Sequence, residues 1–173
     1  EDIRINSKRF QIESDVLVLI ATQQPMARDL RALAAILDII RELERTGDYG
    51  KGISKISLMI GEQDLIKPLL DIPRMCEIAM DMLAHALRAY IAQDEQAARA
   101  IPMEDEQVDS LYNQIRHELM GLILADRSKI EKANMLLWAA HNLERAADRV
   151  TNICERIVFL ITGELADLPD GED

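Results

Sequence analysis

Two acidic pairs with the same spacing stand a hundred residues apart in this chain. Glu44 and Asp48 belong to the segment LERTGD. Glu144 and Asp148 hold the same positions in the segment LERAAD. Residues four apart on a helix share a face, so each pair presents two carboxylates together. Two anions at this spacing repel each other unless a cation lies between them, and hard cations prefer carboxylate oxygens. The spacing therefore predicts two cation sites.

A second set of polar residues precedes each pair by one helix. Asp105 and Asp109 form another acidic pair four residues apart, and the corresponding positions of the first half hold Asp2 and Asn6. An amide at Asn6 offers one anionic oxygen fewer, which should weaken a cation site in the first half. The candidate metal ligands are therefore Glu44, Asp48, Glu144, Asp148, Asp105, Asp109, Asp2 and Asn6.

Two other interpretations of the acidic pairs stay open. Acidic residues four apart are also common on solvated helix faces, where Glu–Arg networks add little stability, so the chain could be a metal-free helical scaffold. A di-metal carboxylate enzyme of the ferritin-like type is the other alternative. That chemistry uses Glu-x-x-His pairs that project into one four-helix core. Neither repeated segment has a His three residues after its Glu, which counts against the enzyme.

The repeat extends well beyond the acidic pairs. Without any gap, Leu37 falls on Leu137 and Ile53 falls on Ile153. A repeat of this length predicts that one helical unit was doubled and that each half has the architecture of the other. The small residue Gly47 would allow another helix to approach the first acidic pair closely.

The composition is typical of a helical protein. Of the 173 residues, 49% are hydrophobic but only 3% are aromatic, and there are seven Gly and five Pro. The abundant straight-chain residues lose little rotamer freedom in a helix. A chain of this length can also bury a sizeable core. We therefore predict an all-α fold.

Apolar periodicity divides the chain into helices and two tandem units. Residues 1–66 are expected to form a first unit with two helices, and residues 67–165 a second unit with three. An acidic, disordered tail is expected over 166–173. Because the pattern is already helical at Glu1, we expect the first helix of the first unit to be absent from this chain. The expected helix ends or kinks lie at Thr22, Gly61, Gln93, Pro102 and Gly163.

Charge and cysteine content exclude several classes of protein. The formal net charge is -11, and no basic stripe of the kind that binds nucleic acid is visible. No apolar run is long enough to insert directly into a bilayer. The two cysteines, Cys76 and Cys154, make no disulfide framework. We therefore predict a cytoplasmic protein that binds no nucleic acid.

Four segments carry a resemblance to the PhoU family of phosphate-transport regulators. They are IATQQPMARDLR (20–31), LERTGD (43–48), DEQVD (105–109) and NLERAADRVTNICE (142–155). The similarity covers nearly the whole chain. It implies two three-helix bundles related by a pseudo-twofold axis, with the acidic motifs on the bundle faces. In this family such motifs can bind metal clusters, often of iron, with zinc, manganese and magnesium as alternatives here.

The resemblance also implies a role and partners. Members act as negative regulators of the phosphate response and are not enzymes. They are thought to be adaptors that link the ATPase of the phosphate ABC transporter to a membrane sensor histidine kinase. Such a protein is cytoplasmic, can lie peripheral to the inner membrane through its partners, and can form a homodimer.

This sequence departs from the family pattern at two places in the motifs. Asn6 stands where many members have Asp, and Ala146-Ala147 replaces a frequent Ile-Gly. Phosphate itself has no evident cradle, since the chain has neither a Gly-rich loop nor a suitable basic cluster.

Overall fold

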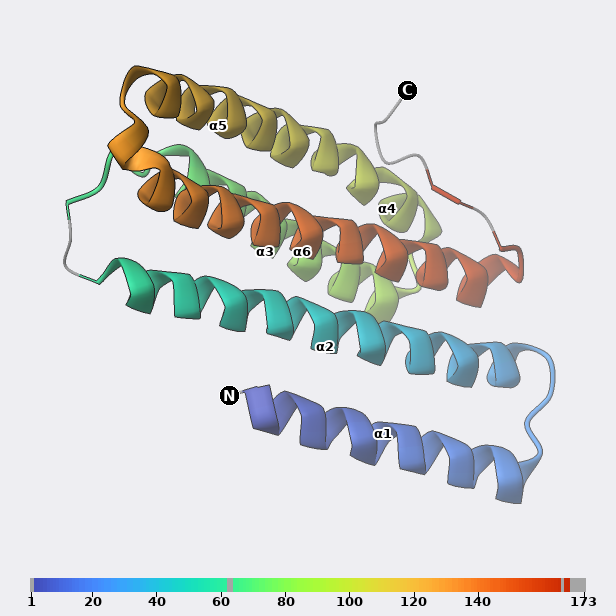
Figure 1. The fold of residues 1–173 in the computed structure, drawn as a ribbon. Coiled ribbons are helices and arrows are strands. Elements are labelled where there is room, and N and C mark those ends of the chain that lie inside the picture. The colour runs from blue at the N-terminus through green and yellow to red at the C-terminus, as the bar shows by residue number, and fades with distance from the viewer. Residues whose placement is uncertain (1, 62–63, 166, 169–173) are drawn as a thin grey trace.

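The structure is a computed structural model that describes residues 2–61, 64–165 and 167–168, with the side chain of Asp2 outside the description. Within that part the chain is helical and has no strand, which confirms the predicted all-α fold (Figure 1). The helices are α1 (Asp2–Gln23), α2 (Arg28–Ile60), α3 (Asp71–Ala92), α4 (Glu95–Ala100), α5 (Asp105–Ala125) and α6 (Ile130–Thr162).

Glycines end the two longest helices, as predicted. Gly61 follows α2 with φ +60°, and its N–H donates to the carbonyl of Ser57 at 3.0 Å. Gly163 follows α6 with φ +82°, and its N–H donates to the carbonyl of Phe159 at 2.8 Å. A residue without Cβ enters this left-handed region at little cost, so both helices stop there.

The predicted kink at Pro102 is a short 3₁₀ turn, Ile101–Glu104, that separates α4 from α5. Asp94 begins α4, where its carboxylate accepts from the Ala97 N–H at 3.0 Å. Since Pro102 has no N–H to continue the helix, α4 ends before it and α5 starts at Asp105.

The hydrophobic core lies among the helices of the second unit. α6 packs against both α3 and α5, and α4 closes one end of the group. Met75 and Met82 of α3 are fully buried there, together with Ile153 and Ile157 of α6. Apolar side chains of α2, among them Ile39, join this core from the first unit. The two units therefore share apolar surface.

α2 and α6 lie antiparallel and form the seam between the two units (Figure 1). Three contacts define their register along the seam. Arg31 meets Gly163 near one end, Glu42 meets Asn152, and Gly52 meets Asn142 toward the other end. Because α6 repeats α2 with an offset of a hundred residues, the last two contacts are related by the repeat.

α1 covers the outer side of α2, and among the described helices it contacts α2 alone (Figure 1). Several of its apolar side chains have more than half of their surface exposed, among them Ile3, Phe10, Leu17 and Val18.

None of the described helices has the length and apolar character needed to cross a membrane.

Most of the predicted tail, 166 and 169–173, lies outside the described residues. Leu168 is described and is buried in the core cluster. Its backbone N–H donates to Oε1 of Glu155 on α6 at 3.1 Å. At this position the chain after α6 therefore folds back onto the helices.

Candidate functional site

The second unit brings its four predicted ligands to one hollow of ≈ 290 Å³. Asp105 and Asp109 come from the start of α5, and Glu144 and Asp148 from the middle of α6. The hollow is also lined by Arg145, Arg149, Thr151, Asn152 and Glu155. Sequence spacing on two separate helices thus predicted a real juxtaposition.

The turn at Pro102 positions the two aspartates. It places Asp105 in the first turn of α5, where a helix N-terminus favours a carboxylate, and only 1% of this residue is exposed. Asp109 follows one helical turn later and is half-buried. Both side chains therefore line the hollow from α5 and are partly withdrawn from water.

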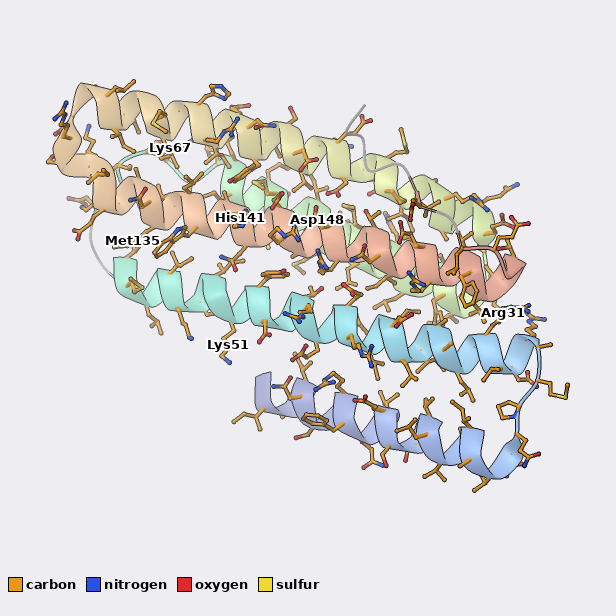
Figure 2. All side chains as sticks on the ribbon, turned by 45° about the vertical axis from the view of Figure 1, so that its right-hand side comes forward. Arg31, Lys51, Lys67, Met135, His141 and Asp148 are labelled. Carbon is orange, nitrogen blue, oxygen red and sulfur yellow. The ribbon has the colours of Figure 1, made fainter. Side chains whose placement is uncertain are left out.

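Negative charge accumulates around Glu144. Burial, and then the nearby carboxylate of Asp148, raise the pKa of the Glu144 carboxyl above its ordinary value. Asp109 adds to this shift, whereas His141 and Arg145 oppose it. Figure 2 shows His141 and Asp148 near the middle of α6. Like charges gathered in a partly buried hollow are the electrostatic condition in which a bound cation is stabilised.

Neighbouring side chains already engage the acidic pair of α6. Nη1 of Arg145 lies 2.6 Å from Oδ2 of Asp148, and Nδ1 of His141 lies 3.2 Å from Oε2 of Glu144. The second contact is an ion-pair distance without hydrogen-bond geometry, since this Glu144 oxygen accepts no hydrogen bond from the described residues. Each carboxylate of the pair therefore has a cationic or ionisable neighbour on its own helix.

The two arginines of the hollow also reach across the seam. Arg145 lies near the hydroxyl of Tyr49 on α2, which contributes to the electrostatic surroundings of its guanidinium. Nη1 of Arg149 donates to Oε2 of Glu42 at 3.4 Å, and Glu42 also accepts from Nδ2 of Asn152 at 3.3 Å. The acidic hollow of the second unit is thus linked by its own cations to the helix of the first.

The donor set of the hollow fits a hard cation. Five carboxylates line it, and oxygen ligands of this kind suit iron, manganese, magnesium or zinc. Across the described residues, however, no three acidic, His or Cys side chains converge on one point. Several carboxylates would therefore have to move to hold one cation, from an arrangement in which Asp148 contacts Arg145 and Glu144 contacts His141.

The first unit places its predicted ligands differently. Glu44 is half-buried and Asp48 is exposed on α2, and Asn6 lies on α1 with a buried Oδ1 that accepts no hydrogen bond from the described residues. A Cβ at Gly47 would lie 3.0 Å from Cδ1 of Ile5, so α1 approaches α2 closely beside this pair, as predicted. The side chain of Asp2, the remaining predicted ligand, falls outside the description.

Thr151 and Glu155 are among the residues of the second hollow that sequence reasoning missed. Thr151 and Glu155 follow Asp148 by three and seven residues on the same helix. These spacings put both side chains on the face of Asp148, so helical periodicity contained a signal for them. Glu155 matters most because it adds a fifth carboxylate to the hollow.

Comparison with known proteins gives consistent matches over both halves. The family model described as the PhoU domain matches residues 1–57 and 72–157. A protein of Caulobacter vibrioides, named phosphate-specific transport system accessory protein PhoU homolog, is 41% identical over 164 residues, which are 94% of this chain and 71% of that protein. A Streptococcus pneumoniae protein of the same name is 36% identical over 168 residues, covering 97% of this chain and 78% of the relative.

Solved structures agree with the sequence relatives. The crystal structure of the phosphate transport system regulatory protein PhoU from Streptococcus pneumoniae matches with a TM-score of 0.88 at 35% identity, covering 96% of this chain and 78% of that one. The crystal structure of PhoU from Pseudomonas aeruginosa matches with a TM-score of 0.89 at 26% identity, covering 94% of this chain and 78% of that one.

Proposed function

This chain belongs to the PhoU family, and from that premise we propose that it is a regulatory accessory protein of a phosphate transport system. The observation that carries the proposal is the family match over both halves, with relatives that are named transport-system accessory proteins. The match includes both acidic motifs of the repeat.

At the finer level the proposed role is that of a cytoplasmic adaptor and negative regulator. It would link the ATPase of a phosphate ABC transporter to a sensor histidine kinase and would reach the membrane through these partners. The support for this role is the family membership together with a helical architecture that leaves long faces of α1 and α2 exposed to partners. A homodimer is compatible with the same faces.

We further propose that the acidic hollow of the second unit binds a hard metal ion. Glu144, Asp148, Asp105 and Asp109 would hold it, with Glu155 beside them. The bound ion would supply positive charge to a site where burial, and then the Asp148 carboxylate, already raise the pKa of Glu144. Glu44 and Asp48 would form a weaker site because Asp48 is exposed and Asn6 offers an amide.

Metal content of the protein, purified without chelator or affinity metal, tests the sites. We expect bound metal in the wild type and its loss from a variant with Glu44→Gln, Asp48→Asn, Glu144→Gln and Asp148→Asn. The matched control is Glu77→Gln with Asp81→Asn, an exposed acidic pair four apart on α3, which should keep full metal content. Equal metal in both variants would contradict the assignment, and no metal in any protein would favour the metal-free scaffold.

Association with partners tests the adaptor role separately. The wild-type protein should be retained by the immobilised transporter ATPase and by the immobilised kinase. Failure to bind either partner would contradict the adaptor role whatever the metal content. If the four-carboxylate variant binds both partners as well as the wild type does, the metal is not required for docking.

A further inference from the structure

Arg145 occupies a position between the acidic hollow and the seam. Its guanidinium lies 2.6 Å from the Asp148 carboxylate on its own helix and lies near the hydroxyl of Tyr49 on α2. The side chain is 39% exposed and that of Asp148 is 26% exposed, so their contact is partly shielded from water. Arg145 therefore has one acidic partner in the hollow and one neutral partner outside it.

A guanidinium and a metal ion compete for the same carboxylate oxygens. Arg stays protonated at any ordinary pH, so Arg145 cannot leave Asp148 by losing its charge. A cation that binds Asp148 must displace this arginine and then tolerate a positive charge nearby. Both effects lower the affinity of the hollow for a metal ion.

We propose that Arg145 is the internal counter-cation of the hollow, which a divalent cation must displace from Asp148, and that Tyr49 holds the displaced guanidinium on α2. This inference rests on the proposed metal binding and adds its regulation. Because Tyr49 belongs to the first unit, metal binding in the hollow of the second unit would depend on the contact between α2 and α6. Arg145 is thus a positioning residue that sets the affinity.

The first half lacks a counterpart of the Arg145–Tyr49 pair. The hundred-residue offset relates Arg145 to Arg45 and Tyr49 to Arg149, so the corresponding pair across the seam consists of two cations. Two cations repel each other, and Arg45 is exposed. The regulated affinity is therefore a property of the second unit.

Manganese binding to the whole chain, from which metal has first been removed with a chelator, tests the proposal. MnCl₂ is titrated into each protein, and the free aqueous ion is measured by electron paramagnetic resonance. Arg145→Gln should bind Mn²⁺ about tenfold more tightly than the wild type because an opposing charge is gone. Arg145→Lys, which keeps the charge, should stay within about threefold of the wild type. Arg127→Gln, an equal charge change at an exposed site before α6, should have no effect.

Tyr49→Phe tests the second half of the proposal. It should weaken Mn²⁺ binding roughly threefold in the wild type, because the guanidinium, once displaced from Asp148, would have the Tyr49 hydroxyl as its remaining partner and would lose it. The same change should have no effect in the Arg145→Gln background. An equal effect in both backgrounds would show that Tyr49 does not act through Arg145.

The outcomes separate this proposal from the one on which it rests. If the wild type binds Mn²⁺ and Arg145→Gln binds no more tightly, the counter-cation role is wrong and the metal site stands. Tighter binding by the Gln and Lys variants alike would also overturn it, since the charge would not be the cause. If none of the variants binds Mn²⁺, both proposals fail. Circular dichroism verifies that each variant is folded.

Discussion

Gly52 of α2 and Asn142 of α6 approach each other so closely that a Cβ at position 52 would lie 2.8 Å from Oδ1 of Asn142. The amide of Asn142 cannot turn away freely, because its Nδ2 donates to the carbonyl of Trp138 at 2.7 Å. The absence of a side chain at Gly52 thus lets the two long helices come together at this end of the seam.

Gly52→Ala should therefore bring none of the stability that Gly→Ala normally adds to a helix. Gly50 is the matched control, because a Cβ there meets nothing within 4 Å. Gly50→Ala should raise the free energy of unfolding by about 0.5–1 kcal/mol. Gly52→Ala should be at least about 1 kcal/mol less stable than Gly50→Ala, as measured by urea denaturation. Equal gains from the two changes would contradict the close approach.

Glu144→Gln should stabilise the metal-free protein at neutral and higher pH. Burial and Asp148 raise the pKa of the Glu144 carboxyl, so its ionised form disfavours the folded state. Stability linked to this group is present when the carboxyl is protonated and is lost as the pH rises through its folded-state pKa. The advantage of the Gln variant should therefore be seen at about pH 7.5 and shrink toward about pH 4.

The melting temperature in excess chelator measures this effect. Glu131→Gln serves as the control, since Glu131 is exposed in the first turn of the same helix, where the helix dipole favours a carboxylate. It should give no gain at any pH. If Glu144→Gln is less stable than the wild type at neutral pH, the attraction of His141 and Arg145 for the Glu144 carboxylate outweighs its burial and its repulsion by Asp148.

Glu42→Ala should weaken the seam more than Asp38→Ala does. Glu42 accepts hydrogen bonds from Arg149 and Asn152, and both ends of its ion pair with Arg149 are only 21% exposed. Its removal should cost about 1–3 kcal/mol because a partly buried guanidinium loses its partner. Asp38 lies 3.7 Å from Arg156 in a more exposed position, so its removal should cost about 0.5 kcal/mol or less. Urea denaturation of the two variants measures the loss in unfolding free energy that each change causes.

Leu168→Ala should destabilise the fold by about 2 kcal/mol, although the residue stands after the last helix. Its side chain is buried in the core cluster, so truncation leaves a cavity. Leu165, which is 71% exposed, provides the control, and its change to Ala should alter the unfolding free energy by less than about 0.5 kcal/mol. Equal effects in thermal unfolding would argue against the docking of Leu168.

Local sequence signals were sufficient for much of the fold. Gly61 and Gly163 end the long helices because backbone chemistry at a helix end depends on one or two residues. Pro102 interrupts its helix for an equally local reason. The acidic residues of the second hollow were also predictable, since the spacing within each helix determines which side chains share a face.

What the sequence did not reveal depends on contacts between distant segments. Periodicity shows that Arg149 and Glu42 lie near an interface, but not that they meet across 107 residues of chain. The rotamer that turns Arg145 toward both Asp148 and Tyr49 is likewise a result of tertiary packing. Leu168 was overlooked because the acidic composition around it outweighs a single apolar residue in any local reading.

The register of the seam predicts that each half pairs better with the other half than with a copy of itself. The contact of Glu42 with Asn152 and that of Gly52 with Asn142 occupy equivalent places along the repeat. Two copies of the first half, joined in the same way, would set Glu42 against Gly52 and leave a carboxylate beside bare backbone. Two copies of the second would set Asn142 against Asn152, with a side chain at the place that Gly52 now leaves open. The two helix faces are therefore complementary to each other rather than to themselves, and we expect this to disfavour exchange of halves between neighbouring chains.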